Sequence, residues 1–80
     1  MSIDRQKHDG WIIQVGLKIA YYRKLRGLTQ FHLAELADIS PGYLSQIETI
    51  SFTHSISLRT VFKIADALDI APHKLLEFKD

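Results

Sequence analysis

Histidine is the residue type in this chain with the widest chemical repertoire, because imidazole transfers protons and binds metal ions near neutral pH. The four histidines, His8, His32, His54 and His73, lie far apart, and none has the two-His spacing of a helical metal site. His32 and Glu35 are three residues apart, but two ligands do not close a zinc site. Cysteines, glycine-rich phosphate loops and nucleophile elbows are also missing from the sequence. We therefore expect no enzyme, no metal and no cofactor.

Length and composition favour one small globular domain. The 80 residues are 46% hydrophobic and 24% charged, which is too apolar for a disordered chain. The sequence has no apolar run near the ~20 residues of a membrane span, and residues 1–10 are rich in charge where a signal peptide is apolar. We therefore expect a cytoplasmic protein without a membrane partner. A core this small leaves little room for an enclosed catalytic pocket and favours a binding module.

The charge is distributed unevenly along the chain. Residues 1–30 carry six basic and two acidic side chains, a net +4, whereas residues 31–80 carry four basic and seven acidic ones, a net −3. The first third is thus suited to face a polyanion. The pI of about 8.1 lies below the range of dedicated nucleic-acid binders. Charge alone therefore permits DNA binding without indicating it.

Apolar spacing predicts an all-α domain of five helices over residues 10–80, preceded by a flexible arm at residues 1–9. The helices are expected at residues 10–26, 30–37, 41–49 and 58–68, with a last short one that begins at Pro72. The side chains expected to face the core are Ile12, Val15, Ile19 and Tyr22 with Leu25 beside them, then Leu33, Ala34, Leu36 and Ala37, then Leu44 and Ile47, then Leu58, Val61, Phe62, Ala65 and Leu68.

Local signals mark where these helices begin and end. Thr29, Ser40 and Ser57 each offer a side-chain oxygen as an N-cap. Two similar corners follow the second and fourth helices, each with an aspartate that tolerates left-handed φ, Asp38 or Asp69, and a proline three residues later. Two short helices joined in this way form either a DNA-reading helix-turn-helix or an ordinary bundle corner. The spacing alone favours the bundle corner.

A longer set of residues carries more information. It comprises Arg23, Gly27-Leu28-Thr29-Gln30, Leu33-Ala34, Ser40 and Tyr43-Leu44-Ser45-Gln46-Ile47-Glu48, then Ser57-Leu58, Ile64-Ala65-Asp66-Ala67-Leu68 and Leu75-Leu76. This set, over about residues 12–77, resembles the Cro/repressor class of helix-turn-helix regulators, also called Xre-like, which includes small phage repressors and restriction-modification controller proteins. The resemblance implies a five-helix, lambda-repressor-like domain, usually a homodimer. Its second and third helices form the helix-turn-helix, and the third lies in the major groove of double-stranded DNA.

The resemblance also implies which residues read bases. The third helix would present Pro41, Gly42, Ser45 and Gln46 to the major groove. The Gln46 amide can pair with adenine through two hydrogen bonds, and the Ser45 hydroxyl can bond several bases. Pro41 and Gly42 would contribute mainly shape. Without the resemblance, Gln46 would be interpreted as an ordinary solvent-exposed helix residue.

Further residues are expected at the DNA backbone and in the scaffold. Phosphate contacts are expected from Thr29, Gln30, Tyr43, Thr49 and Arg59, with long-range attraction from Lys24 and Arg26. At the positions of Arg23 and Glu48, the resemblance implies an ion pair that ties the first helix to the end of the third.

The sequence departs from the family pattern after Glu48. Residues 49–56 contain no lysine or arginine where the family commonly has a glycine and basic residues, so we expect weaker DNA binding. Ile50 in place of the helix-ending glycine indicates a different course for the loop. Phe52, Ile56 and Phe78 lie outside the clear apolar stripes and serve either a partner surface or the core.

These observations leave two functions open. The first is a sequence-specific transcriptional regulator, a repressor or an autoregulatory controller, that binds an inverted-repeat operator as a homodimer. Its pairing surface is expected near the C-terminus, with Leu75 and Phe78 at the interface and Leu76 facing inward. The alternative is a helix-turn-helix protein-interaction module or antitoxin, suggested by the nearly uncharged face from Ser40 to Thr53.

Overall fold

The computed structural model describes residues 2–78, with side chains from residue 7 onward. This part of the chain forms α1 (Ser2–Leu25), α2 (Gln30–Ala37), α3 (Pro41–Ile47), α4 (Leu58–Ala67) and the 3-10 helix η1 (Pro72–Leu75), without a strand. The predicted all-α class is confirmed. The prediction of a fifth α-helix is wrong, because the segment that starts at Pro72 makes only one 3-10 turn.

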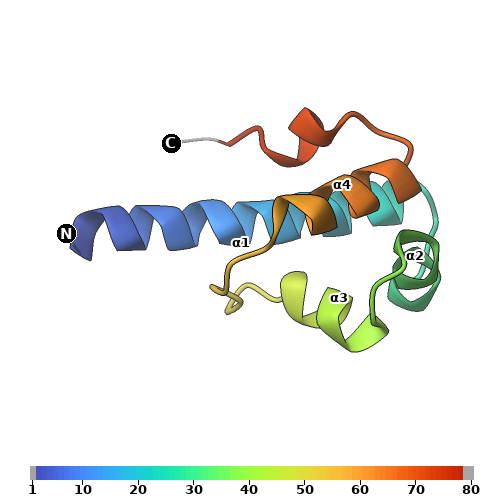
Figure 1. Ribbon diagram of the computed structural model, residues 1–80, viewed down its shortest axis with the longest axis horizontal. Coiled ribbons are helices and arrows are strands. Elements are labelled where there is room, and N and C mark those ends of the chain that lie inside the picture. The colour runs from blue at the N-terminus through green and yellow to red at the C-terminus, as the bar shows by residue number, and fades with distance from the viewer. Residues whose placement is uncertain (1, 79–80) are drawn as a thin grey trace.

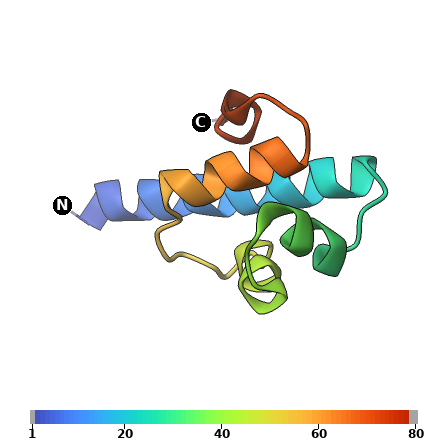
Figure 2. The same ribbon diagram turned by 45° about the vertical axis from the view of Figure 1, so that its right-hand side comes forward.

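Helix α1 forms the long axis of the molecule. In Figures 1 and 2, α4 lies in front of α1, with η1 on one side of this pair and α2 and α3 on the other. Helix α2 contacts both α3 and α4, and η1 contacts both α4 and α1. The helix-turn-helix formed by α2 and α3 is therefore held against two longer helices.

The start of α1 differs from the sequence prediction. The helix begins at Ser2 and not at Gly10, so residues 2–9, expected as a flexible arm, continue the helix. The rings of His8 and Trp11 stack across one turn of this segment, with centroids 5.3 Å apart. The apolar stripe begins only at Ile12, but extending an existing helix costs little free energy even without an apolar face.

The predicted caps and corners are confirmed. The side-chain oxygens of Thr29, Ser40 and Ser57 accept hydrogen bonds from the backbone N–H three residues later, at 3.0, 3.0 and 3.1 Å. Asp38 and Asp69 adopt left-handed conformations with φ of 56° and 57°. These short signals fix the entry to α2, α3 and α4 and the two sharp corners.

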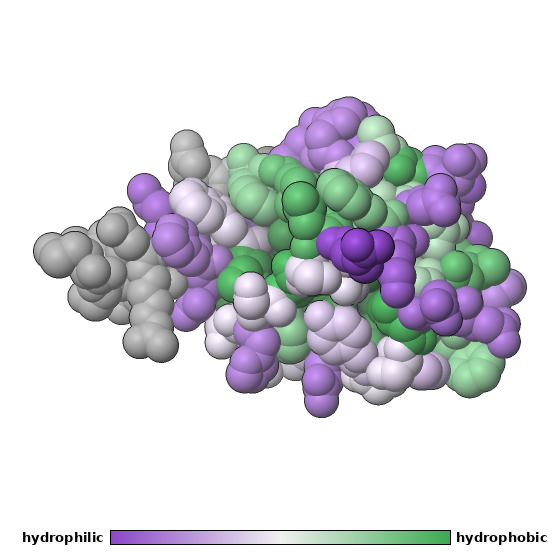
Figure 3. Space-filling model, viewed as in Figure 1, coloured by the Kyte–Doolittle hydropathy of each residue, from purple (hydrophilic) through white to green (hydrophobic). Residues whose placement is uncertain are grey.

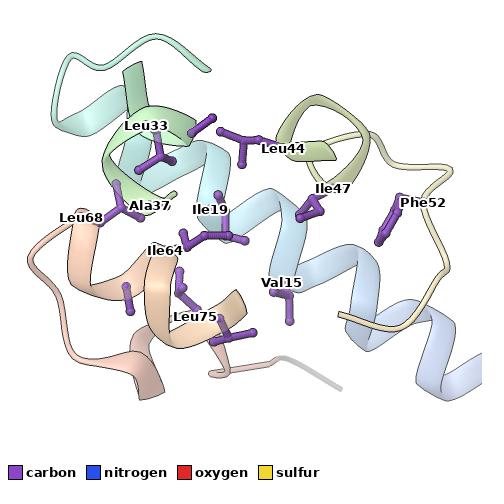
Figure 4. Packing of buried hydrophobic residues seen from close by; sticks show 13 residues of the cluster. Val15, Ile19, Leu33, Ala37, Leu44, Ile47, Phe52, Ile64, Leu68 and Leu75 are labelled. Carbon is purple, nitrogen blue, oxygen red and sulfur yellow. The ribbon is translucent and has the colours of Figure 1, made fainter. Parts of the chain in front are cut away.

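The core draws on every helix and on the loop after α3 (Figure 4). Its buried apolar residues are Val15, Ile19, Leu33, Ala34, Ala37, Leu44, Ile47, Phe52, Val61, Ile64, Ala65, Leu68 and Leu75. Phe52 thus belongs to the core, and Ile56 and Phe78 pack against it half-buried.

Four residues expected to face the core are exposed instead: Leu25, Leu36, Leu58 and Phe62. In α4 the buried set is Val61, Ile64, Ala65 and Leu68, with spacing i, i+3, i+4 and i+7. The inward face is therefore rotated away from Phe62 and toward Ile64.

The backbones of α1 and α3 approach each other directly at Gly16. A Cβ atom placed on Gly16 would overlap the carbonyl oxygen of Ile47, although Gly16 lies inside a helix with ordinary φ. Only glycine allows this approach. Helix α3 therefore rests on the α1 backbone without a side chain between them.

The two leucines of the C-terminal segment have the reverse of their expected roles. Leu75 is completely buried in the core, and Leu76 is 39% exposed. Leu75 is therefore a core residue and not the interface residue we expected. Because consecutive residues of a 3-10 turn point about 120° apart, the two side chains face opposite environments. Phe78 lies against Trp11, with ring centroids 6.3 Å apart.

Candidate nucleic-acid interface

Helix α3 has one buried face and one free face. Leu44 and Ile47 are buried, which turns the opposite side chains outward. The exposed side comprises Pro41, Gly42, Ser45, Gln46 and Thr49. The structure thus brings all four expected base-reading residues together on one exposed face.

One buried carboxylate holds the end of α3. Arg23 donates from Nε to Glu48 Oε2 at 2.8 Å and from Nη2 to Glu48 Oε1 at 2.9 Å. The side chains are only 11% and 5% exposed. Arg23 Nη1 also donates to the carbonyl oxygen of Leu28 at 2.7 Å. The ion pair that the resemblance implies is therefore present, and its two parallel bonds fix both direction and distance.

Gln30 belongs to the same network. Its Nε2 donates to Glu48 Oε1 at 2.9 Å, which places the start of α2 beside the end of α3. We expected Gln30 to contact phosphate, but the sequence did not show this internal hydrogen bond. The only signal available was a polar residue at the N-terminus of a helix whose partner lies 18 positions away.

The other expected phosphate contacts occupy different surroundings. Thr29 caps α2, and Thr49 donates to the carbonyl oxygen of Ser45 at 2.9 Å. Tyr43 is half-buried, with its ring edge-on to Phe52.

Three basic residues were expected to act at the DNA backbone. Lys24 and Arg59 are exposed. Arg26 donates to the Asp69 carbonyl oxygen at 3.1 Å, at the corner between α4 and η1. This contact ties Arg26 to that corner.

A hollow of about 260 Å³ opens at the C-terminal end of α3. It is lined by Gln46, Thr49, Ser51, Phe52 and His54. His54 is a candidate interface residue that the sequence reasoning assigned no role. A hydroxyl-rich loop containing one imidazole was the only signal for it.

Exposed apolar side chains gather elsewhere. Figure 3 shows apolar residues over the middle of the face seen in Figure 1, with hydrophilic residues around them. On α4 and in the C-terminal segment the exposed large apolar residues are Leu58, Phe62 and Leu76. A second groove, of about 240 Å³, is lined by Trp11 and Phe78 together with Ser55 and Ile56 from the loop before α4.

Among the described side chains, from residue 7 to residue 78, there is no group of three or more His, Asp or Glu placed to hold a metal ion. In the same part of the chain, no helix has the length and apolar composition needed to cross a membrane.

The exposed face of α3, the sharp corner that joins α2 to α3 and the buried ion pair behind them are the features of a helix-turn-helix domain. A family model for the helix-turn-helix matches residues 19–75, and the chain belongs to that family. The chain is 38% identical over 66 residues to the HTH-type transcriptional regulator SinR of Bacillus licheniformis and 37% identical over 65 residues to SinR of Bacillus subtilis. These alignments cover 82% and 81% of this chain but 59% and 58% of the relatives, so the chain spans about three-fifths of their length.

Two solved structures are also similar. One is the restriction-modification controller protein C.AhdI from Aeromonas hydrophila, with a TM-score of 0.74 and 31% identity over 80% of this chain and 94% of that one. The other is SinR, described as the master regulator for biofilm formation, in complex with DNA, with a TM-score of 0.73 and 35% identity over 79% and 98%. The predicted resemblance to repressors and controller proteins is confirmed.

Proposed function

We propose that this chain is a sequence-specific DNA-binding transcriptional regulator that acts in the cytoplasm. The observation that carries the proposal is the free face of α3, where Pro41, Gly42, Ser45 and Gln46 are exposed on a helix held firmly from behind. The similarity to a SinR structure containing DNA supports the same use of this face.

In this proposal, α3 enters the major groove. The Gln46 amide pairs with adenine N6 and N7, and Ser45 bonds a neighbouring base. Thr29 and Gln30, at the start of α2, face the phosphate backbone together with Thr49, Tyr43 and Arg59. Lys24 and Arg26 add long-range attraction that is weakened by salt.

Two copies bind together. One α3 presents few base-reading groups, so a single domain gains little over non-specific DNA affinity of ~10⁻⁴–10⁻⁶ M. Pairing through the C-terminal surface, where Phe78 and Leu76 are partly exposed, presents two α3 helices to successive major grooves ~34 Å apart. The operator is then an inverted repeat.

The alternative of a protein-interaction module or antitoxin has less support. The curated relatives are named as transcriptional regulators, and a protein partner is not needed to explain the exposed α3 face. The nearly uncharged surface that suggested this alternative agrees equally well with base reading by amide and hydroxyl groups.

Selection of bound duplexes from a random-sequence library tests the proposal. After several rounds, the recovered DNA should contain an inverted repeat with half-sites about one helical turn apart. The Gln46→Ala variant should recover a different or weaker consensus at one base pair of each half-site. A pool that stays random after selection would contradict sequence-specific binding.

A further inference from the structure

The hollow at the end of α3 adjoins the face proposed to read DNA. Gln46 and Thr49 belong to that face and also line the hollow, together with Ser51, Phe52 and His54 from the following loop. A duplex seated on α3 therefore lies beside the hollow. Residues 49–57 form no helix, and their course is set by Phe52, whose side chain enters the core (Figure 4).

Phe52 also positions His54. The two rings meet edge to face with centroids 5.5 Å apart, and the Phe52 ring also meets that of Tyr43, at 6.4 Å. Because Phe52 is only 8% exposed, it is a fixed support for the exposed imidazole. His54 is therefore held at the rim of the hollow and does not extend freely into solvent.

The polar groups of the hollow suit an anion. No carboxylate lines it, and Glu48, next to Thr49 in sequence, is 5% exposed and bonded to Arg23 and Gln30. The Thr49 hydroxyl already donates to Ser45, which leaves Ser51, Gln46 and His54 as donors. Residues 49–58 contain no lysine or arginine, so His54 is the only side chain in this stretch that can carry a positive charge.

We propose that this hollow receives a phosphate of the DNA backbone, and that protonated His54 supplies the positive charge that binds it. The inference rests on the proposed DNA-binding function and adds one property to it. Histidine changes its charge between about pH 5 and 8, and a bound phosphate favours the protonated form. DNA binding therefore takes up a proton at His54, and the affinity rises as the pH falls.

The test is fluorescence anisotropy with a random-sequence duplex at pH 6 and pH 8 and constant ionic strength. A phosphate contact does not depend on sequence, so the operator is not needed. Wild type should bind more tightly at pH 6. His54→Gln should reduce the pH 6 affinity roughly two- to fivefold, the range of an exposed ion pair, and should reduce the pH 8 affinity less. At pH 6 it should also lower the salt slope by about one.

Two further variants separate His54 from general charge effects. His32→Gln removes another exposed imidazole, from α2, and should keep the wild-type difference between pH 6 and pH 8. His54→Lys keeps the charge at both pH values and should bind at pH 8 as tightly as at pH 6. Thermal unfolding of each variant at both pH values verifies that the fold is intact.

The outcomes distinguish the two proposals. DNA binding by folded wild type with equal pH dependence in His54→Gln would overturn the role of His54 and leave the regulator function standing. Failure of folded wild type to bind any duplex at either pH would overturn the proposed function itself.

Discussion

Arg23 and Glu48 lie 25 positions apart in the sequence, and their side chains meet through two parallel hydrogen bonds. Gln30 donates to the same carboxylate, so one buried group joins α1, α2 and the residue that ends α3. The orientation of α3 therefore depends on a residue that does not lie on its exposed face.

Breaking this ion pair should lower the free energy of unfolding of the domain. Glu48→Ala leaves the Arg23 guanidinium buried with one remaining acceptor, the Leu28 carbonyl oxygen, and should cost about 3–5 kcal/mol of unfolding free energy. A double-mutant cycle with Arg23→Ala, measured by urea denaturation, isolates the coupling between the two side chains. Coupling near zero would show that the pair does not stabilise the fold.

A second ion pair in the same molecule provides the control. Arg26 and Asp69 approach to 3.8 Å, but their side chains are 46% and 91% exposed. Asp69→Asn removes the charge and keeps a residue that tolerates left-handed φ. It should change stability by less than about 1 kcal/mol.

Gly16→Ala should destabilise the protein, although alanine is the better helix former. The added methyl group collides with the Ile47 carbonyl and forces α1 and α3 apart, at an expected cost of about 1–3 kcal/mol. Gly10→Ala, in the same helix with open space around it, should instead stabilise by about 0.5–1 kcal/mol. Thermal unfolding of both variants measures the difference, and equal shifts would argue against the close approach.

Gln46→Ala and Arg59→Ala should weaken DNA binding in different ways. Loss of Gln46 should cost about 1–3 kcal/mol on the selected operator and relax discrimination at one base pair, because a bidentate base contact is lost. Loss of Arg59 should weaken all sequences similarly and lower the salt slope by about one. Titrations on operator and random duplexes at several salt concentrations separate the two. Identical behaviour would refute one of these roles.

Phe78→Glu should weaken self-association. A carboxylate at this half-buried position opposes apolar pairing, so sedimentation at micromolar concentration should shift from dimer to monomer and operator binding should fall. Phe31→Glu changes an exposed phenylalanine on α2 and should leave the dimer intact. Monomeric wild type, together with unaltered DNA binding by Phe78→Glu, would contradict pairing at this surface.

The sequence alone predicts the helix caps and the corners, because the signals for these features are local. Caps such as Thr29 and Ser40 act on an N–H three residues away, and the corner at Asp38 needs only a residue that tolerates left-handed φ. The prediction that Leu44 and Ile47 face the core is correct, because the short helix α3 contains few apolar residues and these two lie on the same face.

The features that the sequence did not predict depend on contacts between distant segments of the chain. Gly16 resembles any helical glycine until α3 is placed against it, and the hydrogen bond from Gln30 to Glu48 requires two helices to meet. In α4, Phe62 and Ile64 are both apolar, and periodicity alone does not decide which of the two side chains faces inward. Packing against α2 and η1 decides it.

The contact between Gly16 and Ile47 also has a mechanical consequence. Side chains usually separate two packed helices, but here the two backbones are in direct contact, so we expect a tilt of α1 to move α3 as well. The same α1 carries Trp11, which stacks on Phe78 at the proposed pairing surface. In a dimer, α1 would therefore couple the angle between the two subunits to the position of each α3 helix in its major groove. The domain should consequently be intolerant of operators whose half-site spacing differs by even one base pair.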